Sequence, residues 1–184
     1  KVFKFLHIGE PSPRKDGQMA VEVFAKLFGN NPDYQLTIKA NEMHQIRQRD
    51  MFGNFEPIFE KYTNIKLITK QMSDDELVQL MHDHHVMVYP SWGEGFGFIP
   101  LQGLATGMPV ITTYDWAHYK KYIGPLKLKA QLTDETLPKS VGDDYIGKMF
   151  KPDGKHLEDQ MYEAVINFKA YSGYYFAQAN EIHK

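Results

Sequence analysis

The sequence has 184 residues, a net charge of −2 at pH 7, no cysteine and a hydrophobic content of 42%. This length suffices for one domain with a sizeable core, and the charge gives no electrostatic reason to expect nucleic acid or an anionic membrane as a partner. The lack of cysteine excludes disulfides, thiolate metal sites and cysteine nucleophiles. No apolar run approaches the length of a transmembrane helix and no signal-peptide pattern is present, so we expect a cytoplasmic protein.

The first third of the chain alternates strand-like and helix-like segments. Val2 to Gly9 is mostly apolar and predicts a buried strand, and Glu10 to Gly17, with two prolines and an Arg-Lys pair, predicts a loop. Apolar residues recur at helical spacing from Asp16 to Phe28, and Tyr34 to Ala40 predicts a second strand. The weaker pattern over residues 41–62 suggests two helical pieces separated near Gly53 and Asn54.

The same alternation continues to residue 113. Ser73 and Glu76 form a capping box, which predicts the start of a short helix. Three further strands and one further helix are predicted: strands at Ile65 to Thr69, Val86 to Tyr89 and Val110 to Thr113, and a helix at Ile99 to Gly107.

The remainder of the chain has weaker patterning. Residues 114–150 hold prolines and mixed charge without a clear period, which predicts an irregular surface segment with one or two short strands. Helical spacing predicts a helix from His156 to Tyr171, and a last helical segment follows Gly173.

Strands that alternate with helices at this spacing predict βαβ units and one α/β domain over residues 1–184. The expected architecture is a Rossmann-like parallel sheet with helices on both faces. Ligands of such sheets bind at the carboxyl ends of the strands. Two loops rich in glycine and proline, residues 9–17 and 90–100, follow strands and therefore meet at that edge.

The stretch from Pro90 to Thr113 has the features of an anion-binding device. A strand leads into the glycine-rich turn Glu94-Gly95-Phe96-Gly97-Phe98, and a helix follows. Such a loop lets the backbone approach a ligand, and the free N–H groups of the helix N-terminus point at it. Glu94 can equally act only as an N-terminal helix acid, and Arg14 and Lys15 can be ordinary solvated charges.

Three blocks of residues together resemble the C-terminal domain of retaining GT-B glycosyltransferases, in the large group that includes glycogen-synthase-like enzymes. The blocks are Gly9 with Pro13-Arg14-Lys15-Asp16-Gly17, then Ser73-Asp74-Asp75-Glu76-Leu77, and then the pattern PS..EGFG....Q..A.G.PVI from Pro90 to Ile111. The resemblance covers most of residues 2–113 and, more weakly, 147–165. It implies one half of a GT-B fold, with the N-terminal acceptor domain outside this sequence; the start at Lys1 in a strand, without Met, agrees with that expectation.

The resemblance also implies an activity and a site. These enzymes transfer a sugar from a nucleotide sugar to an acceptor with retention and without a bound metal or other cofactor. Glu94 falls on the glutamate that holds donor-sugar hydroxyls and is the implied catalytic residue, and Lys15 matches the lysine that neutralises the diphosphate. The implied donor-binding residues are Arg14, Lys15, Met72 (with the segment from Lys70, at the base), Gly95, Phe96, Gly97, Phe98, Leu101 and Gln102.

Two positions depart from the pattern of the family. Glu10 stands where an arginine usually follows the strand glycine, and Arg14 is a candidate replacement. Gln102 stands where a second glutamate usually holds the ribose hydroxyls; its amide oxygen can accept a hydrogen bond but without charge assistance.

Two other functions stay open on the sequence. A nucleotide-sugar epimerase shares the architecture, and a non-catalytic sugar-nucleotide-binding or assembly module would explain Glu10 and Gln102. The expected partners are a nucleotide-diphosphate sugar, an acceptor (glycan, lipid or protein) and the N-terminal domain, without nucleic acid. Peripheral membrane contact would come from the part outside this sequence.

Several residues are assigned structural roles. His82, His84 and His85 lie between a helix and a strand without a second ligand cluster, so we expect surface histidines rather than a metal site. We expect Phe96 and Phe98 to anchor the loop in the core, with only their backbone facing a ligand. Trp92, Trp116 and Tyr114 are expected to pack rather than to stack on a sugar or base.

Overall fold

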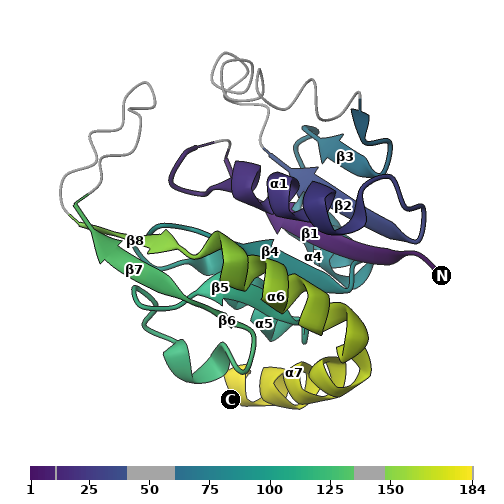
Figure 1. Cartoon of the computed structure of the whole chain (residues 1–184). Helices are drawn as coiled ribbons and strands as arrows, with labels where there is room; N and C mark the ends of the chain where they lie inside the picture. The colour runs from purple at the N-terminus through teal and green to yellow at the C-terminus, as the bar shows by residue number, and fades with distance from the viewer. Residues whose placement is uncertain (11, 41–60, 135–147, 184) are drawn as a thin grey trace.

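The computed structural model of the chain describes residues 1–10, 12–40, 61–134 and 148–183. A six-stranded parallel sheet in the order β3-β2-β1-β4-β5-β6 forms its centre. The strands are β1 (Phe3–Ile8), β2 (Tyr34–Lys39), β3 (Ile65–Ile68), β4 (Val86–Tyr89), β5 (Val110–Thr113) and β6 (Lys127–Leu128). The predicted parallel α/β sheet is therefore confirmed (Figure 1).

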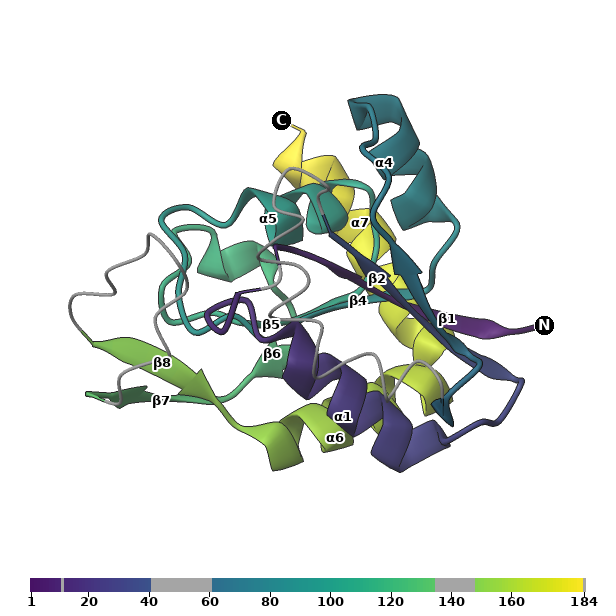
Figure 2. The ribbon, with the colours of Figure 1, turned by 90° about the horizontal axis from the view of Figure 1, so that it is seen from above.

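Helices cover both faces of the sheet, as the sequence predicted. Figure 2 shows α1 (Gly17–Phe28) and α6 (Gly154–Ile166) on one side, and α4 (Asp74–His82) and α5 (Phe98–Ala105) on the other. The last helix, α7 (Phe168–Ile182), follows α6 and packs against α5. Because strand order reverses between β1 and β4, the crevice expected of such folds lies at the carboxyl ends of these two strands.

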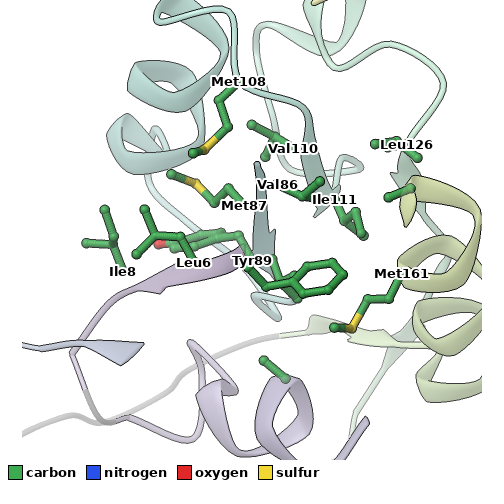
Figure 3. Packing of buried hydrophobic residues seen from close by; sticks show 14 of the residues in the cluster. Leu6, Ile8, Val86, Met87, Tyr89, Met108, Val110, Ile111, Leu126 and Met161 are labelled. Carbon is green, nitrogen blue, oxygen red and sulfur yellow. The ribbon is translucent and has the colours of Figure 1, made fainter. Parts of the chain in front are cut away.

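The core is made by strand side chains that are buried on both faces. Leu6, Met87 and Ile111 lie on neighbouring strands and are fully buried, and Met161 packs in from α6 (Figure 3). Burial of this kind explains why the strands are continuous apolar runs rather than alternating ones, since both faces are covered by helices. Each fully buried side chain of this size contributes about 1.5–3 kcal/mol by leaving water.

The capping box predicted at the start of α4 is present. The Ser73 hydroxyl accepts from the Glu76 amide (3.3 Å), and the Glu76 carboxylate accepts from the Ser73 amide (2.8 Å). These two bonds satisfy orphan N–H groups of the first turn and determine where α4 begins. Two helical pieces were predicted within residues 41–62. Residues 41–60 of that range lie outside the described part of the chain.

The segment after residue 113 contains the short strands that were predicted, but it is not confined to the surface. It contains the 3-10 turn η2 (Lys120–Tyr122), then β6 at the edge of the main sheet, and β7 (Ala130–Thr133), which pairs antiparallel with β8 (Met149–Pro152). Ile123, Leu126 and Leu128 are fully buried. Residues 114–128 therefore contribute buried side chains to the core, and β6 is too short for its periodicity to have revealed this.

The C-terminal helices break at a different place from the one predicted. α6 ends at Ile166 and α7 begins at Phe168, so the junction is Asn167 rather than Gly173. Gly173 lies inside α7, with no atom within 4 Å of the position that a Cβ would take. An isolated glycine is tolerated within a helix when tertiary packing compensates, as the fully buried Tyr175 does here.

Candidate functional site

Two loops meet at the carboxyl edge of the sheet, one after β1 and one after β4. The Trp92 amide donates to the Arg14 carbonyl (2.8 Å), and the Ser91 hydroxyl contacts the same carbonyl (3.3 Å). The Arg14 guanidinium donates to the Gly93 carbonyl (2.5 Å). The prediction that these loops face one another is confirmed, and the hydrogen bonds hold them in a fixed relation.

Asp16 joins the second loop to the start of α1. Its carboxylate accepts from the Met19 amide (3.2 Å) as the helix N-cap and from the Trp92 indole (2.9 Å). Asp16 takes a left-handed conformation, with φ of 50°. Trp92 is buried, so its predicted packing role is confirmed and one cap residue orients both loops.

Glu94 is the centre of a hydrogen-bonded cluster at this edge. Both carboxylate oxygens accept from the Lys15 ammonium at 2.8 Å, and Oε1 lies 2.9 Å from the Arg14 guanidinium. The hydroxyls of Ser91 (2.7 Å) and Tyr89 (3.0 Å) also donate to Oε1. The Glu94 side chain is only 8% exposed, so a carboxylate placed deep in the site is satisfied by two cations and two hydroxyls.

The electrostatics of the cluster keep Glu94 ionised. Burial alone would raise the pKa of the Glu94 carboxyl, but Lys15, Ser91 and Arg14 together outweigh it and hold that pKa below its usual value. Burial lowers the pKa of the Lys15 ammonium, and Glu94 opposes that change. Burial raises the pKa of the Tyr89 phenol, so Tyr89 stays a neutral hydrogen-bond donor.

Gly97 sets the path of the loop into α5. Its φ is +80°, and a Cβ there would lie 2.5 Å from the Tyr119 hydroxyl and against the Trp116 ring. The same Tyr119 hydroxyl donates to the Gly97 carbonyl. Trp116 packs here and donates to Thr113 (2.8 Å), as expected for a structural residue. Only glycine fits this position, and α5 begins directly after it.

A hollow of about 330 Å³ opens beside the cluster. It is lined by both cations predicted for the first loop, Arg14 and Lys15, and by Glu10. The other lining residues come from the ends of β1 and β2 and from α4 and α5: Ile8, Gly9, Lys39, Ala40, Leu77 and Ile99. An elongated anionic ligand can therefore lie across the carboxyl ends of β1 and β2.

Gln102 lines a second hollow of about 410 Å³, between α4, α5 and the end of α7. Leu77 of α4 lines both hollows, so the two are neighbours. Gln102 is exposed and does not line the hollow that holds Lys15. A ligand that contacts both Glu94 and Gln102, as predicted, would therefore have to extend past Leu77 from the first hollow into the second.

The other predicted site residues occupy different environments. Gly95 and Phe96 are exposed in the loop, and Phe98 is 66% exposed at the start of α5. The expectation that Phe96 and Phe98 anchor the loop in the core is wrong: their rings pack on each other (4.7 Å between centroids), and Trp116 and Tyr119 take the anchoring role. Met72 and Leu101 are partly buried against the core and line neither hollow.

The histidines near residue 84 have structural contacts. His84 donates to the Leu80 carbonyl (2.7 Å) and contacts the Thr37 hydroxyl (2.8 Å), and His85 accepts from the Lys4 amide (3.0 Å). Both are partly buried, contrary to the expectation of surface histidines. Within the ranges that the structure describes, no three His, Cys, Asp or Glu side chains are grouped as metal ligands.

Sequence reasoning missed three polar residues of the site. Tyr89 and Ser91 donate to Glu94, and Lys39 lines the hollow at the end of β2. Tyr89 and Ser91 lie shortly before the glycine-rich turn, so their place in the motif was a signal. Lys39 could be noticed only as a charge that ends a buried strand.

Comparison with protein families gives one match. The model of the family described as "Glycosyl transferases group 1" matches residues 1–143. No curated protein matches the sequence. Among the helices of the described ranges, none has both the length and the apolarity that a bilayer span requires.

Three solved structures illustrate the similarity in fold. WaaG, a glycosyltransferase involved in lipopolysaccharide biosynthesis, is 14% identical with a TM-score of 0.64, covering 97% of this chain and 43% of WaaG. Sucrose-phosphate synthase from Thermosynechococcus elongatus is 17% identical with a TM-score of 0.72, covering 99% and 40%. A structure described as trehalose-6-phosphate from E. coli, bound with UDP-2-fluoro glucose, is 11% identical with a TM-score of 0.73, covering 98% of this chain and 40% of that one. The chain thus spans less than half the length of these structures.

Proposed function

The chain belongs to the group 1 glycosyl transferases, and we propose that it is the half that binds a nucleotide-diphosphate sugar for retaining transfer of a hexosyl group. The observation that carries this proposal is the assembly of Arg14, Lys15 and Glu94 between two strand-to-helix loops, beside a hollow at the carboxyl edge of the sheet. Cations, a carboxylate and a helix N-terminus in one place suit a ligand that joins a sugar to a diphosphate.

The two ends of the cluster would meet the two parts of the donor. The hydroxyls of Ser91 and Tyr89 donate hydrogen bonds to Oε1 of Glu94, and sugar hydroxyls can donate to the same oxygen in their place. An oxocarbenium-like sugar would be stabilised by this carboxylate. Glu94 therefore acts on the sugar, and holding and orienting its hydroxyls is its proposed role.

The diphosphate would be met by the first loop. The Lys15 ammonium can donate three hydrogen bonds, and its present partners include Glu94 and Tyr89. When the nucleotide sugar binds, the ammonium can turn from these groups toward a phosphate oxygen. With Arg14 and the amides at the start of α5, Lys15 would stabilise the charge that the departing nucleoside diphosphate acquires. We propose that these groups suffice without a bound metal, so EDTA would leave donor affinity unchanged.

We also propose that the donor half works with a second half of the protein, which binds the acceptor. Peripheral membrane contact would come from that second half. The epimerase and the non-catalytic module stay alternatives that share the donor-binding step.

Isothermal titration of the 184-residue chain with UDP-, GDP- and ADP-sugars tests the proposal. We expect the chain to prefer one base, and we expect Lys15→Met to lower the affinity for the preferred nucleotide sugar. Lys26→Met is the matched control, because Lys26 lies on the exposed surface of α1 and pairs with Glu158 away from the hollow. A folded chain that binds none of the ligands at millimolar concentration contradicts the proposal.

A further inference from the structure

Lys39 is a buried lysine at the end of a central strand. It is the last residue of β2, in register with Ile8 of β1 and Ile68 of β3, and it is 3% exposed. Lysine is almost never so deeply buried unless its charge is compensated. Its place on the lining of the hollow makes this lysine a candidate ligand-binding residue.

The alternation of side chains along β2 shows which face Lys39 occupies. Leu36 is in register with Phe5 of β1, whose ring contacts α1, so Leu36 and Ile38 face that helix. Thr37 lies on the opposite face, where its hydroxyl contacts His84 beyond the end of α4. Lys39 shares the face of Thr37 and lines the hollow with Leu77 of α4 and Ile99 of α5.

The charges of the hollow are predominantly positive. Arg14, Lys15 and Lys39 are the cations among its described lining residues, and Glu10 is the acid. The Lys39 ammonium donates to the Ala40 carbonyl (2.6 Å), which directs it to the carboxyl edge where the strand ends. A lining with three cations and one carboxylate fits a phosphate better than it fits a neutral ligand.

The strand order assigns the three charged groups to different parts of the donor. β1 lies between β2 and β4, so Lys39 of β2 and Glu94, which follows β4, stand on opposite sides of the β1 loop that carries Lys15. Lys15 contacts Glu94 directly (2.8 Å), whereas Lys39 lines the same hollow as Lys15 but Glu94 does not. Lys15 therefore lies between Glu94 and Lys39, so a donor with its sugar at Glu94 and its outer phosphate at Lys15 points its inner phosphate toward Lys39.

We propose that Lys39 binds the α-phosphate of the donor and supplies the cation that Glu10 fails to supply in the first loop. This inference rests on the proposed donor-binding function and adds to it a residue and a phosphate. It also explains why a lysine ends a strand whose other inward positions are apolar or uncharged.

Binding of a nucleoside, its monophosphate and its diphosphate to Lys39→Met tests the inference, with the base that the wild-type chain prefers. We expect the monophosphate and the diphosphate to bind about tenfold or more weakly, the loss typical of one charge-assisted contact, while nucleoside affinity is unchanged. Lys39→Arg, which keeps the charge, should restore part of the loss. Lys66→Met is the control, because Lys66 is exposed on the neighbouring strand β3.

Three results overturn the assignment of Lys39, and the third does not depend on whether the variant folds. Unchanged monophosphate affinity in a folded Lys39→Met chain contradicts it, and so does an equal loss for nucleoside and monophosphate, which would place Lys39 at the base. Should Lys39→Met not fold, the NMR signal of the Lys39 Cε group in the wild-type chain must shift with the monophosphate but not with the nucleoside, and no shift contradicts the inference. A wild-type chain that binds no nucleotide at all refutes the donor-binding function itself.

Discussion

Replacement of Gly97 by alanine should destabilise the chain because two independent costs coincide at this position. At φ of +80° a side chain carries the strain of the left-handed region, about 1–2 kcal/mol. The new methyl group would also lie 2.5 Å from the Tyr119 hydroxyl and against the Trp116 ring. Both neighbours are held by hydrogen bonds, Tyr119 to Gly97 and Trp116 to Thr113, so neither can move without loss.

The two costs add to a measurable loss of stability. Overpacking a filled site costs about 1–3 kcal/mol, so Gly97→Ala should lower the free energy of unfolding by roughly 2–5 kcal/mol in total. Urea denaturation followed by far-ultraviolet circular dichroism measures this change as a shift of the midpoint.

Gly95 offers a matched control two residues earlier in the same loop. It has no positive φ, and no atom lies within 4 Å of the position that its Cβ would take. Gly95→Ala should therefore cost nothing and can gain up to about 1 kcal/mol by restricting the unfolded chain. Equal midpoints for the two variants would refute the reasoning that Trp116 and Tyr119 shape this loop.

Two further predictions concern the core. Burial lowers the pKa of His7 to about 4 from 6.5, so below about pH 6.5 the unfolded chain binds a proton that the folded chain refuses, and the free energy of unfolding should fall by about 3 kcal/mol toward pH 4 and below. His7→Gln should flatten that part of the urea-measured pH profile, and an unchanged slope would be inconsistent with a neutral buried imidazole. Leu128→Ala should cost about 2–5 kcal/mol because Leu128 is fully buried; the same change at Leu132, which is 52% exposed in β7, should cost less than about 1 kcal/mol, and similar losses would contradict the core position of β6.

The elements predicted correctly from the sequence are those whose signals are local. β1 to β5, α1, α4 and α5 lie within one or two residues of the predicted bounds, because buried parallel strands are apolar runs and the Ser73 capping box marks a helix start. The two facing loops followed from topology alone, since parallel strands bring their carboxyl ends to one edge.

The features that the sequence did not reveal depend on tertiary contacts. β6 has two residues, and its place is set by the burial of Leu126 and Leu128 rather than by any period. Phe96 and Phe98 are exposed because Trp116 and Tyr119 already fill the space where the loop is anchored. Hydrophobicity cannot tell which of several aromatic residues will be buried.

The sequence predicted the three charged residues at the centre of the candidate site but not the bonds between them. Arg14, Lys15 and Glu94 were named from the motif, whereas the hydroxyls on Glu94 and the burial of Lys39 emerge only in three dimensions. Gln102 illustrates the limit of spacing: eight positions from Glu94, it lines the neighbouring hollow.

The central claim is that Glu94 acts on the sugar of the donor, and a comparison of two ligands tests it most directly. The affinities of wild-type chain and Glu94→Gln for the preferred nucleotide sugar and for its nucleoside diphosphate should be measured by titration. The variant removes a negative charge beside Lys15 and Arg14, so it should bind the diphosphate as tightly or more tightly, while the nucleotide sugar loses about tenfold relative to the diphosphate. An equal change for both ligands would contradict the assignment of Glu94 to the sugar.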